Sequence, residues 1–131
     1  MWPNTYSGSG LGVMELNKEN KFAEWTKVAV LYCDGLTYQG NRKDPYDYKN
    51  TQLYFRGAVN TRAHIKWIDQ QFNIQNSSKI LLMGGSAGGI AVYMWVDYIR
   101  DMLEDPSKLY GVVDSGIFLD LSTIAEYVKT S

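Results

Sequence analysis

The chain has 131 residues, 45% of them hydrophobic, and its 13 Lys and Arg against 14 Asp and Glu give a formal net charge of −1. This length and apolar content are enough for one globular domain over residues 1–131, and not enough for two. The near-neutral, unclustered charge argues against nucleic acid or an anionic membrane as a partner, and no apolar run approaches the roughly 20 residues of a membrane span.

One strand is predicted in the first third of the chain. Residues 2–21 are rich in Gly, Ser and Asn, which is typical of irregular structure. The continuous apolar run Val28–Tyr32 is typical of a parallel strand covered on both faces, and Cys33-Asp34-Gly35 closes it. We expect Asp34 to stabilise the turn, because Asp before Gly commonly hydrogen-bonds its own backbone. Cys33 is the only cysteine, which excludes an internal disulfide and a cysteine-based metal cluster, and we expect a buried free thiol.

A surface excursion and a helix follow. Residues 39–50 indicate a solvated surface loop, although their tyrosines could also line a substrate groove. After the short apolar segment Leu53–Phe55, apolar residues recur on one face over Ala58–Phe72 and predict a helix. His64 lies inside this helix and is the only histidine, which makes a zinc site improbable.

The most informative stretch joins a predicted strand, Lys79–Met83, to a helix that begins with the apolar run Ile90–Val96. Gly84, Ser86 and Gly88 between them fit G-x-S-x-G, the nucleophile elbow of α/β hydrolases, in which a serine sits on a sharp strand-to-helix turn. Such a turn brings the two backbones together, so the positions two before and two after the serine have no room for side chains. The glycines of the turn are Gly84, Gly85, Gly88 and Gly89.

Other interpretations of this turn can be weighed against the sequence. A phosphate-binding Walker loop needs Lys and then Ser or Thr after its last glycine, whereas Gly89 is followed by Ile90 and Ala91. A dinucleotide fingerprint needs G-x-G-x-x-G, and Ser86 occupies the place of its middle glycine. A turn of small residues that only lets helix and strand pack closely is the remaining alternative. The strand before the turn and the helix after it favour the elbow.

Ser86 stands at the N-terminus of the second helix, where free N–H groups and the helix dipole would stabilise an oxyanion, with the Ala87 N–H as the nearest donor. This helix should end before Pro106. A third strand is predicted over Leu109–Val113, and a final helix should begin near Thr123, which has capping-box spacing to Glu126.

Alternating strands and helices predict an α/β fold with a parallel sheet and flanking helices. Asp34, Ser86 and Asp114 each follow a predicted strand. Functional residues of such sheets gather at the carboxyl ends of the strands, so we expect these three along one rim.

Several stretches, in order along nearly the whole chain, resemble the pectin acetylesterase and Notum carboxylesterase family. The matching stretches are Trp2-Pro3 with the loop Gly8–Gly12, Asn20–Trp25 leading to Tyr32–Gly35, Tyr54–Gly57, Gly84–Gly89 and Asp114–Asp120. Five ordered motifs are far more specific than one elbow.

The resemblance implies a partial α/β-hydrolase fold and serine-based hydrolysis of a carboxylic ester without a cofactor. The substrate would be an acetylated polysaccharide or another acylated molecule. Ser86 matches the family nucleophile, and Ala87 matches the residue whose N–H contributes to the oxyanion hole. The resemblance also implies an extracellular protein, although residues 1–4 lack the basic and apolar regions of a signal peptide.

The resemblance also implies that parts of the catalytic machinery lie outside this chain. Family members carry a Gly-Gly-Trp type oxyanion loop upstream of the Trp-Pro stretch, and an acid and a histidine well downstream of the Asp-Ser-Gly stretch. We therefore expect the central third of a family member, weakly active or inactive by itself. A non-catalytic remnant or interaction module, with a partner chain covering its exposed sheet edges, is the alternative.

Three residues inside the chain can be weighed as partners for Ser86. His64 precedes the serine, against the Ser, acid, His order of α/β hydrolases, and is read as a structural or surface residue. Asp114 is the candidate acid that would orient a histidine supplied from elsewhere, with Asp120 a weaker one, although Asp114 belongs to a structural motif in the family.

Overall fold

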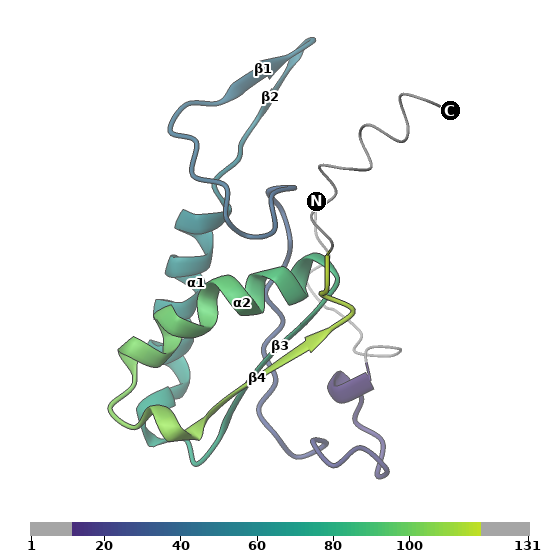
Figure 1. The fold of residues 1–131 in the computed structure, drawn as a ribbon, viewed down its shortest axis with the longest axis vertical. Coiled ribbons are helices and arrows are strands. Elements are labelled where there is room, and N and C mark those ends of the chain that lie inside the picture. The colour runs from purple at the N-terminus through teal and green to yellow at the C-terminus, as the bar shows by residue number, and fades with distance from the viewer. Residues whose placement is uncertain (1–11, 119–131) are drawn as a thin grey trace.

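The computed structural model describes residues 12–118 of the chain. Its helices and strands are β1 (Tyr46–Tyr48), β2 (Thr51–Leu53), α1 (Gly57–Phe72), β3 (Ile80–Gly85), α2 (Ala87–Met102) and β4 (Leu109–Asp114), with 3-10 turns at Gly12–Met14, Ile74–Asn76 and Pro106–Lys108 (Figure 1). The predicted final helix near Thr123 lies outside the described residues.

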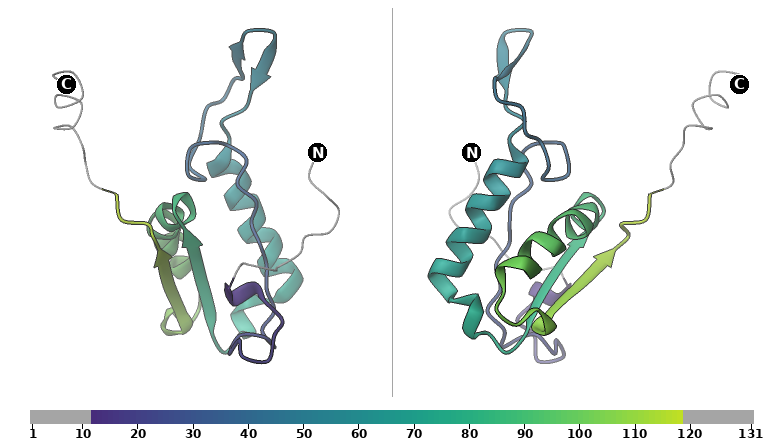
Figure 2. Two further views of the ribbon diagram at one scale, coloured as in Figure 1. Left: turned by 90° about the vertical axis from the view of Figure 1, so that its right-hand side faces the viewer. Right: turned by 60° about the vertical axis from the view of Figure 1, so that its left-hand side comes forward.

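Residues 12–118 form two small sheets. β3 and β4 pair in parallel, in a register that runs from Ile80 opposite Leu109 to Gly85 opposite Asp114. Parallel neighbours need a long crossover, and α2 supplies it while packing against both strands. β1 and β2 form an antiparallel hairpin that projects from the rest of the molecule (Figures 1 and 2). The chain is therefore a mixed α/β protein.

The hydrophobic core lies between the two helices and one face of the β3–β4 sheet. Its buried residues are Ala58, Ile65, Ile74, Trp95, Ile99 and Leu103. A Cβ at Gly111 would lie 3.4 Å from Cγ1 of Val92, so Gly111 and its cross-strand partner Leu82 face α2. The opposite face carries Met83, Tyr110 and Val112, which are all exposed. One face of the sheet is thus covered and the other is open among the described residues.

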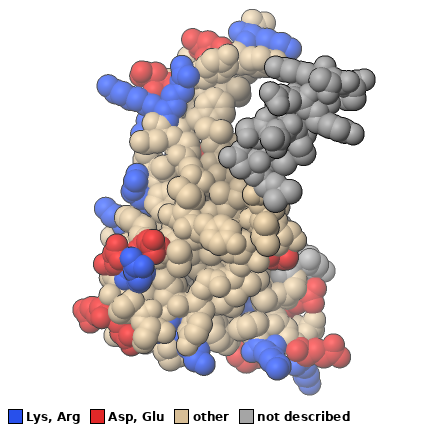
Figure 3. Space-filling view, in the orientation of Figure 1, with Lys and Arg blue, Asp and Glu red and all other residues tan. Residues whose placement is uncertain are grey.

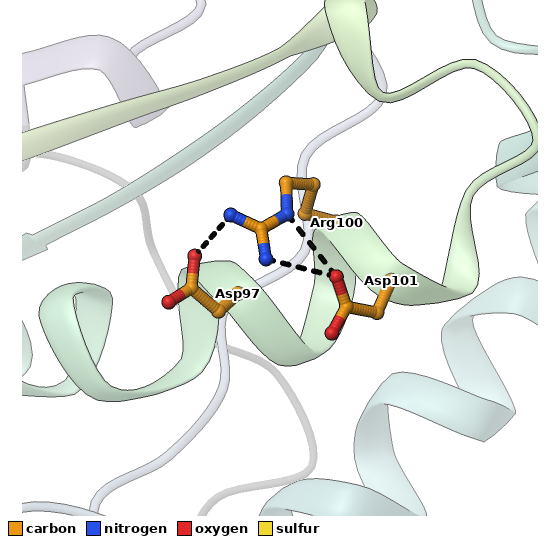
Figure 4. Close-up of polar contacts among 3 residues, drawn as sticks. All are labelled: Asp97, Arg100 and Asp101. Atoms are coloured by element: carbon orange, nitrogen blue, oxygen red, sulfur yellow. Dashed lines mark hydrogen bonds and ion pairs between the residues drawn. The ribbon is translucent and has the colours of Figure 1, made fainter.

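Local signals explain where the helices end. α1 ends at Asn73, whose φ of 48° is left-handed and whose N–H donates to the Asp69 carbonyl over 2.7 Å. α2 ends three residues before Pro106 in the extended Leu103. In its last turns the exposed Arg100 bonds Asp97 over 2.7 Å and Asp101 over 2.9 Å (Figure 4). The hydrogen bond to Asp101, followed by the charge of Asp97, raises the pKa of Arg100. The guanidinium is a cation near the helix C-terminus, where the dipole favours it.

The ends of the two helices are also tied to each other. Gln75 Nε2 donates to the Met102 carbonyl over 3.0 Å, and the Glu104 N–H donates to Gln75 Oε1 over 3.0 Å. Buried Lys108 donates from Nζ to the Gln75 carbonyl. These bonds hold together the connectors that precede β3 and β4, so the two strands start in register.

The predicted strand at Val28–Tyr32 is wrong, because this run has no regular structure and no strand among the described residues pairs with it. A continuous apolar run becomes a strand only where a neighbour accepts its backbone hydrogen bonds. The described parallel sheet therefore has two strands, and Val28, Leu31 and Tyr32 stay exposed. The β1–β2 hairpin differs from the solvated loop predicted over residues 39–50, although its strand residues are all exposed.

Cys33 is also exposed, and the expectation of a buried thiol is wrong, because only part of its segment is covered: Asp34 is buried, whereas Leu31 and Tyr32 are exposed like Cys33. Its Sγ donates to the Leu31 carbonyl at 3.7 Å. No helix in the described part of the chain has the length and apolar character needed to cross a membrane.

We predict that Ile99→Ala lowers the free energy of unfolding by about 2–5 kcal/mol, because it leaves a cavity where α2 meets α1. Ile99 is 7% exposed, whereas Met94 on the same helix is 56% exposed. Met94→Ala is the matched control and should change stability by no more than about 0.5 kcal/mol. Urea denaturation of both variants is the measurement, and equal losses would contradict this description of the core.

Candidate active site

Ser86 occupies the single position between β3 and α2. Its backbone has φ 52° and ψ −117°. A positive φ is uncommon for a residue with a side chain, and sparsely populated conformations cost on the order of 1–3 kcal/mol and cluster at functional sites. The serine thus has the strained backbone that a sharp strand-to-helix turn imposes.

Backbone hydrogen bonds from two elements hold this conformation. The Ser86 N–H donates to the Asp114 carbonyl at the end of β4 over 2.9 Å. The Ser86 carbonyl accepts from the N–H of Gly89 at 2.9 Å and of Ile90 at 3.2 Å, which closes the first turn of α2. The β3–β4 pairing and the first turn of α2 therefore both hold the backbone of Ser86.

Two glycines let the helix approach the sheet this closely. A Cβ at Gly84 would lie 2.9 Å from the Cα of Gly88 and closer still to its carbonyl, as the sequence predicts. A Cβ at Gly89 would lie 2.8 Å from the Cα of Gly116. At Gly88, however, the prediction is wrong, because a Cβ there would meet no described atom within 4 Å apart from its chain neighbours and the nearby backbone of its own helix. α2 presents the backbone of Gly88 to β3 and directs its Cβ position outward.

The Ser86 side chain is exposed and makes no helix-capping hydrogen bond. Serine is among the best N-cap residues, and its hydroxyl normally accepts from an N–H of the first turn. Here the hydroxyl is not used in this way. None of the described hydrogen bonds is donated by the N–H of Ala87 or Gly88, the first two residues of α2. An exposed hydroxyl and free N–H groups thus meet at the positive end of a 16-residue helix.

Asp114 lies beside Ser86 through its backbone. Its Cα is opposite Gly85 in the sheet register, and its carbonyl accepts the Ser86 N–H. The exposed carboxylate accepts a hydrogen bond from Ser115 Oγ at 3.0 Å. By strand alternation it shares a face with Tyr110 and Val112, away from α2. The structure thus places Asp114 next to the serine, with a carboxylate directed to the open face.

Asp34 has a different role. It is 5% exposed, and its carboxylate accepts the N–H groups of Leu36 at 3.1 Å, Tyr38 at 3.2 Å and Gly40 at 2.8 Å. The predicted turn-stabilising function is confirmed. No described hydrogen bond joins Asp34 to Ser86 or Asp114, and its bonds stay within its own loop.

His64 is exposed on α1, and no described hydrogen bond or ion pair joins it to Ser86. It lines a shallow cavity together with Leu31, Cys33, Asp34, Tyr38, Gly57, Asn60 and Thr61. Burial, followed by the charges of Cys33, Tyr32 and Asp34, raises the pKa of Tyr38, whose hydroxyl donates to the Val30 carbonyl at 3.1 Å. Among residues 12–118, no group of three or more His, Cys, Asp or Glu is arranged to hold a metal ion.

Sequence reasoning missed the contribution of residues 115 and 116. Ser115 has φ 52°, like Ser86, and Gly116 packs against Gly89. A signal is present in the sequence, because a serine directly follows β4, as Ser86 directly follows β3. The turn after β4 therefore forms one side of the elbow.

Fold and site together define the class of protein. It is a mixed α/β protein in which a strained, exposed serine lies between a parallel strand and a helix. The family model described as Pectinacetylesterase matches residues 1–130. The chain therefore belongs to the pectinacetylesterase family, as the ordered motifs predicted.

Characterised relatives fall into two groups. Pectin acetylesterase 5 of Arabidopsis thaliana is 34% identical over 105 residues, which cover 79% of this chain and 24% of the relative. Palmitoleoyl-protein carboxylesterase notum1a of Danio rerio is 30% identical over 128 residues, or 91% and 24% of the two chains. The Drosophila melanogaster NOTUM is 28% identical over 125 residues, or 91% and 19%. The chain thus spans about a quarter of the length of these relatives, and no solved structure matches it.

We predict opposite effects for alanine at the two glycines of the serine pattern. Gly84→Ala should lower stability by about 1–3 kcal/mol, because its methyl group would collide with the Gly88 backbone. Gly88→Ala should leave stability unchanged or raise it by up to about 1 kcal/mol, because Ala is the better helix former. Thermal unfolding compares them, and a larger loss at Gly88 would contradict the observed packing.

Asp34→Ala should lower the free energy of unfolding by at least about 1.5–3 kcal/mol, because three backbone N–H groups lose a charged acceptor. Asp44→Ala is the matched control, since this exposed carboxylate accepts no described hydrogen bond. Chemical denaturation measures both variants. An Asp34→Ala chain as stable as Asp44→Ala would show that the loop does not depend on this carboxylate.

Proposed function

We propose that Ser86 is the nucleophile of a carboxylic ester hydrolase of pectin acetylesterase type, of which this chain is a portion. The observation that carries the proposal is the conformation of Ser86, a backbone with positive φ and an exposed, uncapped hydroxyl between β3 and α2. The G-x-S-x-G pattern, with its strand before and helix after, supports the same assignment. On this proposal β3, α2 and β4 are the centre of an α/β-hydrolase fold.

The reaction would proceed through an acyl-enzyme. Ser86 Oγ attacks the ester carbonyl carbon while a histidine takes the hydroxyl proton, and the alcohol then leaves with that proton. Water attacks the acyl-serine in the same way and releases the acid. The Ala87 N–H, at the start of α2, would donate to the oxyanion that forms on the carbonyl oxygen.

The histidine base is proposed to come from outside these 131 residues. His64 is the only histidine in the sequence and lies on α1, with no described contact to Ser86. Asp114 would orient the incoming imidazole, because its carboxylate is exposed one register position from the serine. The names of the relatives point to acetylated pectin or an acylated protein as the substrate, and the family resemblance to an extracellular location.

The test supplies the base from solution. We predict that the purified chain, given p-nitrophenyl acetate and imidazole, forms an acetyl adduct on Ser86 that intact-mass and peptide spectra detect. Ser86→Ala should lose the adduct and the part of p-nitrophenol release that exceeds the reaction with imidazole alone. The loss of one oxyanion-hole donor typically slows turnover about 10²-fold to 10³-fold. An activated ester such as p-nitrophenyl acetate still reports acylation of the serine when such a donor is missing.

Ser115→Ala is the matched control for this experiment. Ser115 also follows a parallel strand with φ 52° and is exposed, but its hydroxyl is bonded to Asp114. The Ser115→Ala variant should form the Ser86 adduct and release p-nitrophenol like the unsubstituted chain. Equal total acetylation, by intact mass, of the chain and of Ser86→Ala, or no acetyl adduct on either, would refute the assignment of Ser86 as the nucleophile. A stable oligomer without any adduct would favour the non-catalytic interaction module.

A further inference from the structure

The connector between α1 and β3 carries a sequence pattern that the proposed reaction does not use. Asn76, Ser77 and Ser78 fit N-x-S, the acceptor pattern for an N-linked oligosaccharide, and the middle residue is not proline. No other asparagine of the chain is followed two residues later by serine or threonine. A three-residue pattern is common by chance, so it predicts a modification only where the asparagine is accessible.

The backbone of this connector is fixed by hydrogen bonds that leave the Asn76 side chain unused. The Asn76 N–H donates to the Asn73 carbonyl over 3.0 Å. The Ser77 N–H donates to the Ile74 carbonyl over 3.1 Å. Ile74 is buried, whereas Asn76 and Ser78 are both exposed. None of the described hydrogen bonds involves the Asn76 amide or the Ser78 hydroxyl, so both groups that the pattern requires are accessible.

The residue before the acceptor, Gln75, anchors the connector to the body of the molecule. Its side chain bonds the Met102 carbonyl and the Glu104 N–H, and its own carbonyl accepts from Lys108. Asn76 takes part in none of these bonds. A sugar attached to the Asn76 amide would therefore leave the anchor of the connector intact.

The acceptor and the candidate nucleophile lie at opposite ends of β3. Asn76 precedes the strand and Ser86 directly follows it, and the six residues of β3 span roughly 20 Å. The connectors before β3 and β4 lie at the lower end of the molecule in Figure 1, and charged side chains of both signs gather at that end (Figure 3). An oligosaccharide there would extend into solvent and leave Ser86 uncovered.

We infer that Asn76 is an attachment site for an N-linked oligosaccharide, an inference that rests on the extracellular location given with the proposed function. Asn76 Nδ2 would attack the anomeric carbon of an N-acetylglucosamine in an oligosaccharide carried on a lipid pyrophosphate. A C–N bond forms, the bond from that carbon to the pyrophosphate oxygen breaks, Nδ2 loses one proton and the lipid pyrophosphate leaves. The bulky, hydrophilic product would shield the end of the molecule where β3 and β4 begin.

The test uses the chain secreted from a eukaryotic host behind a cleavable leader and treated with peptide N-glycosidase in heavy-oxygen water. We expect the untreated chain to be heavier by one oligosaccharide, and the treatment to leave a heavy-oxygen label at position 76. Asn76→Gln and Ser78→Ala should each lose the oligosaccharide completely. Ser78→Thr should keep it, because either hydroxyl residue satisfies the pattern.

Asn50→Gln is the matched control. Asn50 is also exposed, but a threonine follows it directly instead of two residues later. This variant should carry the oligosaccharide like the unsubstituted chain. An unmodified Asn76 on the secreted chain, or an oligosaccharide that persists in Ser78→Ala, would overturn the inference.

The reaction of Ser86 is read separately on the same material. With p-nitrophenyl acetate and imidazole, the chain should form the Ser86 adduct to the same extent before and after removal of the oligosaccharide. An adduct that forms only after removal would overturn the placement of the oligosaccharide away from the site. Loss of the adduct in both forms, with Asn76 modified, would refute the assignment of Ser86 while supporting that of Asn76.

Discussion

The structure around the candidate site depends on one backbone hydrogen bond, from the Ser86 N–H to the Asp114 carbonyl. This bond continues the β3–β4 ladder one residue past the end of β3, so the turn is held by the sheet. The left-handed φ of Ser86 costs on the order of 1–3 kcal/mol, and the first turn of α2 offsets part of this through the bonds that its carbonyl accepts. The serine is therefore strained because two regular elements must meet at it.

Close packing of small residues makes this meeting sterically feasible. Gly84 faces the Gly88 backbone, and Gly89 faces Gly116, so strand, helix and the turn after β4 approach within backbone contact distance. At the opposite end, Gln75 and Lys108 fix the starts of the same strands. The exposed hydroxyl is thus positioned by rigid elements, as an accurate functional site requires.

Periodicity in the sequence predicted α1, β3, α2 and β4 closely, because each forms from local pattern plus one buried face. The predicted strand at Val28–Tyr32 is wrong for the opposite reason. Its apolar residues need a neighbouring strand, which the described chain does not provide. The sequence does not predict the β1–β2 hairpin because its two-residue turn, Lys49-Asn50, lacks the glycine that such turns favour. Lys49 nevertheless adopts the positive φ of 53° that the turn requires. Ser86 could be predicted because the sharp turn requires small residues around the serine. Which of the flanking glycines is crowded depends on how α2 is rotated about its axis, and the sequence does not show this.

The central claim, that the turn presents Ser86 Oγ for attack beside free N–H groups, is tested most directly by a crystal structure of the chain treated with a reactive organophosphonate in the presence of imidazole, which supplies the base. The account predicts continuous density from Ser86 Oγ to phosphorus, with φ still positive and the phosphoryl oxygen about 2.7–3.1 Å from the Ala87 nitrogen. An unmodified serine with an ordinary right-handed backbone and its hydroxyl capping the helix would contradict it.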